Sequence, residues 1–408
     1  MTYQLRGGTL IDGTGADPRA DASLVLEGDR IATVESGSLN GKARGEVIDL
    51  DGLTLLPGLI DAHSHFGLVS MTDDRSPPAV TAARIFRNCE LALDAGFTTV
   101  RDVGGIDGGV AQAVALGLIP GPRIFPSGPL LCQTGGHGDE SSPFAADHHG
   151  HSHGIPGLVI AADPCDGPDQ VRLAARNAFR RGATQIKVCV SGGAVSFTDR
   201  LEDAQFTVEE LKAAVAEADA RDTYVTAHAH NVRGIRNGLA AGIECFEHGT
   251  FLDEETATAM AAAGAYLVPT FAVLRIFREM AKDWGVPDEI IPRIDGLEEA
   301  MAASLKLARD AGVVIGAGSD ILGPEQNRRG LELAIRADLG GAMEAIVAST
   351  AINARILRQA DDIGTVETGK RADLIAIDGD PLNDANVFDD PARVVLVIKD
   401  GQVVKDIR

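Results

Sequence analysis

The chain has 408 residues, of which 45% are hydrophobic, and a formal net charge of -22 at pH 7. This size allows one large α/β domain together with a small accessory domain. The acidic balance argues against a nucleic-acid partner and against an anionic membrane, since both call for a basic surface. We attribute the acidity to solubility, and we expect no nucleic acid and no membrane among the partners.

The cysteines and the N-terminus bear on the compartment. Five scattered cysteines, an odd number with no CxxC pair, are typical of a reduced environment. The N-terminal stretch lacks the basic start and apolar core of a secretory signal, and no apolar run approaches the ~20 residues of a membrane span. We therefore expect a cytoplasmic protein in which Cys189 and Cys245 fill the core.

Both ends of the chain are predicted to be β structure. Residues 3–56 consist of short apolar segments separated by turn residues, with a hairpin turn at Gly28 and Asp29. The C-terminal end repeats this pattern, with a turn at Asp400 and Gly401. We expect residues 1–56 and 360–408 to pair into one small β-sandwich domain.

Residues 57–359 instead alternate short apolar strands with alanine-rich helical stretches. Eight candidate strands follow in chain order: LIDAHSHF, FTTVRDVG, RIFPSG, TQIKVCV, TYVTAHAH, GIECFEHG, AYLVPTF and GVVIGAGSD. This is the number of strands in a (β/α)8 barrel. A doubly wound sheet is the alternative, but no glycine-rich phosphate loop follows the first strand. The predicted fold class is therefore α/β, a TIM-like barrel with a β-sandwich domain formed from both termini.

Two segments interrupt the barrel pattern. Residues 130–168 are predicted to form a long loop after the third strand, rich in Gly, Pro, His and Asp, and such loops are usually functional or disordered. This loop contains His148, His149, His151 and His153, which could bind a further metal, although a solvated loop is the preferred interpretation. Residues 273–296, after the seventh strand, are predicted to form an inserted helix that contributes to a lid.

Histidines gather where several barrel strands end. The residues concerned are His63 and His65 on the first strand, His228 and His230 on the fifth, His248 on the sixth and Asp320 on the eighth. Side chains two apart on a strand share a face, so His63 and His65 point the same way. An isolated pair of histidines often does no more than cap a strand. The joint pattern at the C-terminal strand ends, where barrel chemistry takes place, favours a metal site.

Lys187 is the least expected residue, because it lies inside an apolar strand between Ile186 and Val188. Burial lowers the pKa of a lysine amine, which makes it a nucleophile or a ligand precursor, although a lysine that reaches out of the barrel rim is the alternative. A neutral amine can take up CO2 to form a carbamate that bridges two cations. In that arrangement His63, His65 and Asp320 hold one divalent ion, His228 and His248 hold the other, and carboxylated Lys187 holds both. An open position for a shared water is typical of a catalytic site.

The motifs DAHSH, IKVCVSGG, AHAH, FEHG and GSD resemble the metal signature of the amidohydrolase superfamily, in its binuclear, carboxylated-lysine type. The segment QTGGHGD, residues 133–139, resembles an imidazolonepropionase-like branch of Xaa-Pro, Xaa-Arg and Xaa-Lys dipeptidases and N-acyl amino acid hydrolases, with ochratoxin-degrading amidases as relatives. The resemblance implies that His137 contacts the carbonyl oxygen of the scissile amide. Relatives often carry Tyr where this chain has His230, which shares a face with His228 and is expected to reach the substrate.

The resemblance implies a metal-dependent hydrolase that cleaves the amide bond of dipeptides or N-acyl amino acids by a metal-bridging hydroxide. Asp320 would accept the proton of the water and His137 would stabilise the oxyanion. The metal ions are expected to be Zn²⁺, with manganese, cobalt and iron left open. Other amides such as ochratoxin, cyclic amides and lactones are alternative substrates. A mononuclear deaminase, an imidazolonepropionase-type ring hydrolase and a non-catalytic scaffold are less favoured functions. The resemblance also implies a homo-oligomer.

Overall fold

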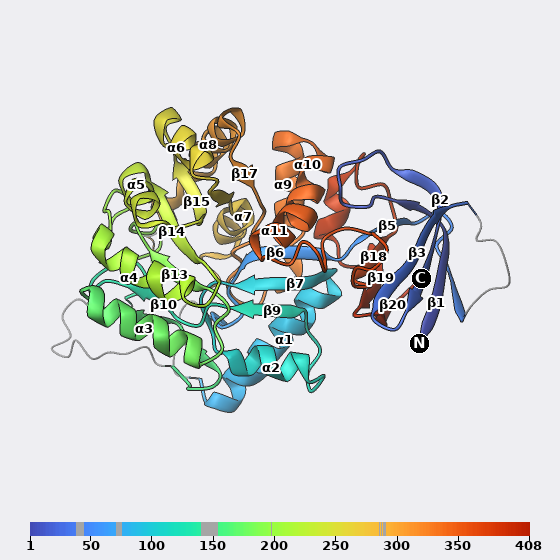
Figure 1. Cartoon of the computed structure of the whole chain (residues 1–408), viewed down its shortest axis with the longest axis horizontal. Helices are drawn as coiled ribbons and strands as arrows, with labels where there is room; N and C mark the ends of the chain where they lie inside the picture. The colour runs from blue at the N-terminus through green and yellow to red at the C-terminus, as the bar shows by residue number, and fades with distance from the viewer. Residues whose placement is uncertain are drawn as a thin grey trace.

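The computed structural model describes residues 1–37, 45–70, 76–139, 154–196, 198–284, 286, 288 and 291–408. The histidine run from His148 to His153 lies outside the described residues. A barrel of strands and helices stands beside a β domain that holds both chain termini (Figure 1). Within the described residues, no helix has the length and apolar character needed to cross a membrane.

The β domain joins the two ends of the chain in one sheet. Its strands are β1 (Thr2–Leu10), β2 (Arg19–Glu27), β3 (Arg30–Ser36), β4 (Glu46–Asp49), β5 (Thr54–Pro57), β18 (Leu374–Ile377), β19 (Val394–Lys399) and β20 (Gln402–Asp406). The join is the antiparallel pairing of β5 with β18. Both predicted hairpins are present, and Asp400 and Gly401 have φ values of 49° and 69°, as a tight two-residue turn requires. The β-sandwich built from both termini is thereby confirmed, whereas domain boundaries at residues 56 and 360 stay a prediction.

The barrel strands lie in chain order and pair in parallel within two sheets. They are β6 (Leu59–Ser64), β7 (Phe97–Asp102), β9 (Arg123–Pro126), β10 (Leu130–Cys132), β13 (Ile186–Cys189), β14 (Val225–Asn231), β15 (Cys245–Phe251), β16 (Tyr266–Val268) and β17 (Val314–Ile315). The segment after β17 returns to β6, where the Ala62 amide donates to the Ala317 carbonyl at 3.1 Å and the Asp320 amide to the His63 carbonyl at 2.8 Å. These bonds place Asp320 beside the histidines of β6, as the barrel prediction requires.

Helices cover the outside of the barrel (Figure 1). They are α1 (Pro78–Asp94), α2 (Gly108–Ala115), α3 (Pro168–Arg180), α4 (Val208–Asp219), α5 (Val232–Ala241), α6 (Glu254–Ala262), α7 (Phe271–Met280), α8 (Leu297–Ala311), α9 (Leu331–Gly340), α10 (Ala342–Val347) and α11 (Asn353–Ile356), with short turns η1 (Ile291–Ile294), η2 (Gln326–Arg328), η3 (Ala348–Ile352) and η4 (Ala385–Asp389). In α3 the apolar stripe Val171, Ala174 and Ala178 is buried against the sheet side, as its helical spacing predicts. A capping box of Thr207 and Glu210 starts α4.

The third barrel strand differs from its prediction. It ends at Pro126, bends at residues 127–129 and resumes as β10, because Gly128 has a positive φ of 70° and Pro129 lacks an amide donor. As a result β9 pairs with β7, while β10 pairs with β13. The predicted long loop from residue 130 therefore begins with a strand, and its far end holds β11 (Val159–Ile160) and β12 (Ala162–Pro164). The strand β11 pairs with β8 (Gly105–Ile106), and β12 pairs with β10.

Candidate metal centre

Two groups of side chains meet at the C-terminal ends of the barrel strands. In the first group, Nε2 of His63 lies 3.1 Å from Nε2 of His65, and these two atoms lie 3.3 Å and 3.2 Å from Oδ1 of Asp320. Both histidines are buried. The sequence expectation that His63 and His65 point the same way and meet Asp320 agrees with this geometry.

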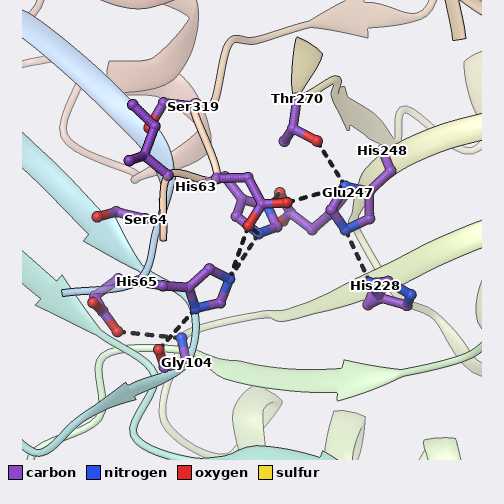
Figure 2. A network of polar contacts seen from close by, with 12 residues as sticks. His63, Ser64, His65, Gly104, His228, Glu247, His248, Thr270 and Ser319 are labelled. Atoms are coloured by element: carbon purple, nitrogen blue, oxygen red, sulfur yellow. Dashed lines mark hydrogen bonds and ion pairs between the residues drawn. The ribbon is translucent and has the colours of Figure 1, made fainter. Parts of the chain in front are cut away.

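The second group comes from β14 and β15. Nδ1 of His228 lies 2.9 Å from Nε2 of His248, and the ring of His230 stacks on that of His248 with centroids 4.8 Å apart. One ligand atom from each of these three residues lies within 4.8 Å of the others. The rings of His63 and His248 are 4.9 Å apart, so the two groups form one centre. Figure 2 shows His248 between Thr270 and His228, next to the first group.

Outer hydrogen bonds determine which ring nitrogens face inward. Nδ1 of His65 lies 2.8 Å from the carbonyl oxygen of Gly104, and Nε2 of His228 lies 3.2 Å from that of Gly192 (Figure 2 shows the first pair). A carbonyl oxygen only accepts, so these nitrogens carry the protons of the neutral rings. The lone pairs of His65 Nε2 and His228 Nδ1 therefore point to the centre.

These inward lone pairs fit a divalent cation. His63 turns its Nδ1 toward the Glu247 carboxylate, at 2.7 Å, so its Nε2 also faces inward, next to His65 and Asp320. Imidazole lone pairs and a carboxylate this close repel one another unless a proton or a cation lies between them. The donor set of imidazole and carboxylate is one that zinc and related ions accept, and buried outer partners are typical of metal-binding histidines. Each group could therefore hold a metal ion.

The electrostatics of the centre favour unprotonated ligands. Burial lowers the pKa of His230 to about 3, and it brings the pKa values of His228 and His248 well below their ordinary value, helped by neighbouring imidazoles. Burial alone would raise the pKa of Asp320, but His63 and His65 hold it well below its ordinary value. The rings of His228, His230 and His248 are therefore neutral at neutral pH, beside an ionised Asp320 carboxylate.

Lys187 lies in the middle of β13, opposite Thr226 of the neighbouring strand. It is fully buried, and burial lowers the pKa of its amine, although the Glu247 carboxylate opposes the shift. A buried amine with a lowered pKa is the state that the carbamate hypothesis requires. The alternative, a lysine extending out of the barrel rim, does not match this burial.

His137 reaches the same centre from the segment after β10. Its ring stacks on that of His228 with centroids 4.0 Å apart and planes inclined by 23°. Its Nδ1 lies 2.5 Å from the Ser196 hydroxyl, and its backbone amide donates to Gln205 at 2.9 Å. Burial lowers the pKa of His137 to about 4, so this ring is neutral at pH 7. The structure thus brings all eight of the predicted site residues to one end of the barrel.

Two of these residues have an unusual backbone. His248 has a φ of 66° and Asp320 a φ of 55°, in the left-handed region that non-glycine residues seldom adopt. Such a conformation costs on the order of 1–3 kcal/mol and persists only where the surroundings impose it. At Asp320 this backbone conformation is held by the hydrogen bond that the Asp320 amide donates to the His63 carbonyl. Backbone strain at both positions points to function.

Sequence reasoning missed the residues that support the ligands. Glu247 precedes His248 and contacts His63, and Asp61 accepts from the His63 and Ser319 amides, both at 3.0 Å. Arg329 contacts the carboxylate of Asp61 from 268 residues away. The sequence did contain a signal for Glu247 and Asp61: each is a charged residue inside an apolar strand, as Lys187 is. Nothing local marked Arg329.

Comparison with known proteins agrees with this geometry. The model of the amidohydrolase family matches residues 54–404. Ochratoxinase from Aspergillus niger is 37% identical, over 98% of this chain and 85% of the relative. Among solved structures, a prolidase complexed with N-methylphosphonate-L-proline is 35% identical with a TM-score of 0.95, over 100% of both chains. A Xaa-Pro dipeptidase with bound methionine is 31% identical with a TM-score of 0.89, over 99% of this chain and 100% of the other.

Proposed function

The chain belongs to the amidohydrolase family, and on that basis we propose a binuclear metal-dependent hydrolase that cleaves the amide bond of dipeptides or N-acyl amino acids. Hydrolysis of amide bonds follows from membership of the family. Dipeptides and N-acyl amino acids as substrates are supported by relatives named prolidase and Xaa-Pro dipeptidase, which match over almost the full chain. The observation that carries the proposal is that two histidine groups form one centre, with the buried Lys187 near enough for its charge to act on His65 of one group and His228 of the other.

In this proposal the ligands divide between two ions. His63, His65 and Asp320 would hold one ion, His228 and His248 would hold the other, and Lys187, as a carbamate, would contribute to both. Two divalent ions, Zn²⁺ in this proposal, would lower the pKa of a bound water and polarise the scissile carbonyl. The outer partners of the histidines keep the ligand nitrogens unprotonated and oriented.

Asp320 and His137 carry the proton transfer and the charge stabilisation. The ionised carboxylate of Asp320 accepts the proton of the attacking water and later delivers it to the leaving amine. When the Ser196 hydroxyl donates to Nδ1 of His137, the neutral ring carries its proton on Nε2. This N–H group would then donate a hydrogen bond to the carbonyl oxygen. A neutral His137 is therefore the form that the reaction requires.

His230 is the proposed contact of the substrate carboxylate. Its Nδ1 lies 2.7 Å from the Thr250 hydroxyl, which leaves Nε2 to face the centre. A free C-terminal carboxylate on the substrate would accept from this nitrogen. The cleaved product is then the C-terminal amino acid, and we favour proline or an apolar residue at that position.

A second candidate substrate is an ochratoxin-like amide, favoured by the 37% identical ochratoxinase. Cyclic amides and lactones are a further alternative. A mononuclear deaminase or ring hydrolase is disfavoured, because a single-metal site needs no bridging carbamate at Lys187. A cytoplasmic location and a homo-oligomer stay predictions, and light scattering after size-exclusion chromatography tests the assembly.

A release assay on metal-loaded enzyme tests the proposal. The panel contains Xaa-Pro, Xaa-Phe and Xaa-Arg dipeptides, N-acyl amino acids and ochratoxin, each free acid beside its C-terminal amide. We expect hydrolysis of free acids with apolar or proline residues, and much slower hydrolysis of the amidated forms. Equal rates on amidated substrates would contradict carboxylate recognition. Cleavage of lactones or cyclic imides alone would contradict the amide assignment.

A further inference from the structure

The ring of His137 is held by the segment between β13 and α4, residues 190–207, here called the β13–α4 loop. On one side the ring lies against Gly193, where an added Cβ would come within 2.1 Å of Nδ1. On the other side it stacks on His228. Ser196, also from this loop, contacts Nδ1. The orientation of His137 therefore depends on where the loop backbone lies.

A buried carboxylate shapes the inner part of this loop. Asp199 accepts from the Gly193 amide at 3.1 Å and from Nε2 of Gln205 at 2.8 Å. The same Gln205 side chain accepts the backbone amide of His137 at 2.9 Å. These bonds join the loop to His137 but leave its outer carbonyl groups free to bind elsewhere.

Arg293 binds those carbonyl groups. It belongs to η1, near the end of the insertion of residues 273–296, and lies about a hundred residues from the loop in sequence. Its Nη2 donates to the carbonyl oxygens of Gly193 at 3.0 Å and Asp199 at 2.9 Å, and its Nη1 donates to that of Ser196. One guanidinium thus fixes three separate points of the β13–α4 loop, including the two residues that contact the His137 ring.

We propose that Arg293 is a positioning residue of the hydrolysis, which holds the β13–α4 loop so that Gly193 and Ser196 aim Nε2 of His137 at the scissile carbonyl oxygen. This inference rests on the proposed function in one respect, the contact between His137 and that oxygen. The planar fork of arginine can reach three carbonyl groups at fixed angles, whereas a lysine ammonium presents a single point charge on a flexible stem. The insertion that the sequence predicted as part of a lid would therefore hold the β13–α4 loop in place.

The test uses R293K in the full-length, metal-loaded enzyme, with R275K as the matched control. Arg275 lies on α7 of the same insertion and binds Glu298, at 3.0 Å, rather than the loop. The first measurement is hydrogen–deuterium exchange of peptides covering residues 191–206. We expect faster exchange there in R293K, with unchanged exchange in the barrel strands and unchanged metal content, and no change in R275K.

The second measurement compares binding and turnover. A misplaced catalytic contact costs about 100-fold at a displacement of ~1 Å, so kcat of R293K should fall about 10- to 100-fold with KM nearly unchanged. Affinity for N-methylphosphonate-L-proline, whose tetrahedral phosphorus resembles the transition state, should fall in parallel, while affinity for the product amino acid stays the same. S196A should reproduce this split, and the double variant should add little to R293K.

The outcomes separate the inference from the function it rests on. Unchanged exchange of the loop in R293K would overturn the tie between Arg293 and the loop. Faster exchange with unchanged kcat, or equal losses of phosphonate and product affinity, would overturn the positioning role. If the wild-type enzyme cleaves no free-acid amide, the proposed function fails, and the exchange measurement still decides whether Arg293 holds the loop.

Discussion

The carboxylate of Glu247 lies 2.7 Å from Nδ1 of His63, and both side chains are fully buried. The second carboxylate oxygen of Glu247 accepts from Arg101 at 2.7 Å. Burial would raise the pKa of Glu247, but Arg101 and Lys187 hold it well below its ordinary value. A charged, hydrogen-bonded carboxylate therefore fixes the tautomer of a metal-facing imidazole, as outer partners of metal ligands commonly do.

We expect E247Q to weaken metal binding. The glutamine keeps the size of the side chain but loses the negative charge that faces Nδ1 of His63. Outer partners of this kind are worth about 10- to 100-fold in metal affinity. Competition with a chelator, followed by metal analysis, measures the change. The control is E244Q, which removes an exposed carboxylate paired with Arg358 on the barrel surface. Equal metal affinity in E247Q and wild type would show that the Glu247 contact is only structural.

Replacing Asp320 by asparagine should abolish turnover while leaving most of the metal in place. The amide keeps an oxygen that can face an ion, but it cannot accept a proton from water. General-base catalysis accounts for about 10²- to 10⁴-fold in rate, so kcat should fall by at least two orders of magnitude. Stopped assays and metal analysis on the same sample check both parts. Near wild-type activity in D320N would remove Asp320 from the proton transfer.

Most of the candidate site could be predicted because its residues lie at or near the C-terminal ends of the barrel strands. Strand alternation and the end of each barrel strand are local features, so His63, His65 and His248 could be placed at the C-terminal strand ends from the sequence, and their joint pattern favoured a metal site. The fold followed for the same reason, since eight apolar strands alternate with helices. The broken third strand was missed because its cause, Gly128 at positive φ before Pro129, reads equally well as a strand end.

The supporting residues could not be predicted from local patterns. Glu247 meets His63 across 184 residues, and Arg293 meets the Gly193 carbonyl across 100 residues. Such contacts depend on how the strands close into a barrel and on where an insertion folds back. Neither of these produces a periodic pattern of residues in the sequence. Three-dimensional structure was therefore needed to connect the lid insertion with His137.

Glu332, a buried acid on α9, predicts a pH-dependent stability. Oε2 of Glu332 accepts from the Phe271 and Ala272 amides at 2.7 and 2.8 Å, at the start of α7. Burial raises the pKa of Glu332 from 4.5 to about 8, so the folded protein holds a proton there that the unfolded chain has lost above pH 4.5. This stabilising contribution is complete below pH 4.5 and is lost as the pH rises through 8.

We therefore expect the free energy of unfolding of wild type to fall, relative to that of E332Q, on the order of 3 kcal/mol between pH 5 and pH 8. The glutamine is neutral throughout and keeps an oxygen for the two amides. Denaturant unfolding at pH 5, 6.5 and 8 measures the difference. E299Q, on the exposed face of α8, serves as the control. Parallel pH profiles for wild type and E332Q would contradict a protonated Glu332.

His230 can serve the substrate or a metal ion, and H230F distinguishes the two roles. The ring is buried, its Nδ1 is taken by Thr250, and one of its nitrogens lies within 4.8 Å of ligand atoms of His228 and His248. A hydrogen bond to a charged group is worth about 1.5–3 kcal/mol, so loss of a carboxylate contact should raise KM for free-acid dipeptides about 10- to 100-fold.

In that case metal analysis should still find two ions per chain, and hydrolysis of amidated dipeptides should not change, because they lack the carboxylate that His230 would bind. The comparison variant is H248F, which removes a proposed ligand and should lose metal from the second group. If H230F instead loses metal as H248F does, with rates on free-acid and amidated substrates falling together, His230 is a third imidazole ligand of that ion. The neutral ring expected from its lowered pKa suits both roles, so the decision rests on metal content and on the ratio of the two substrate rates.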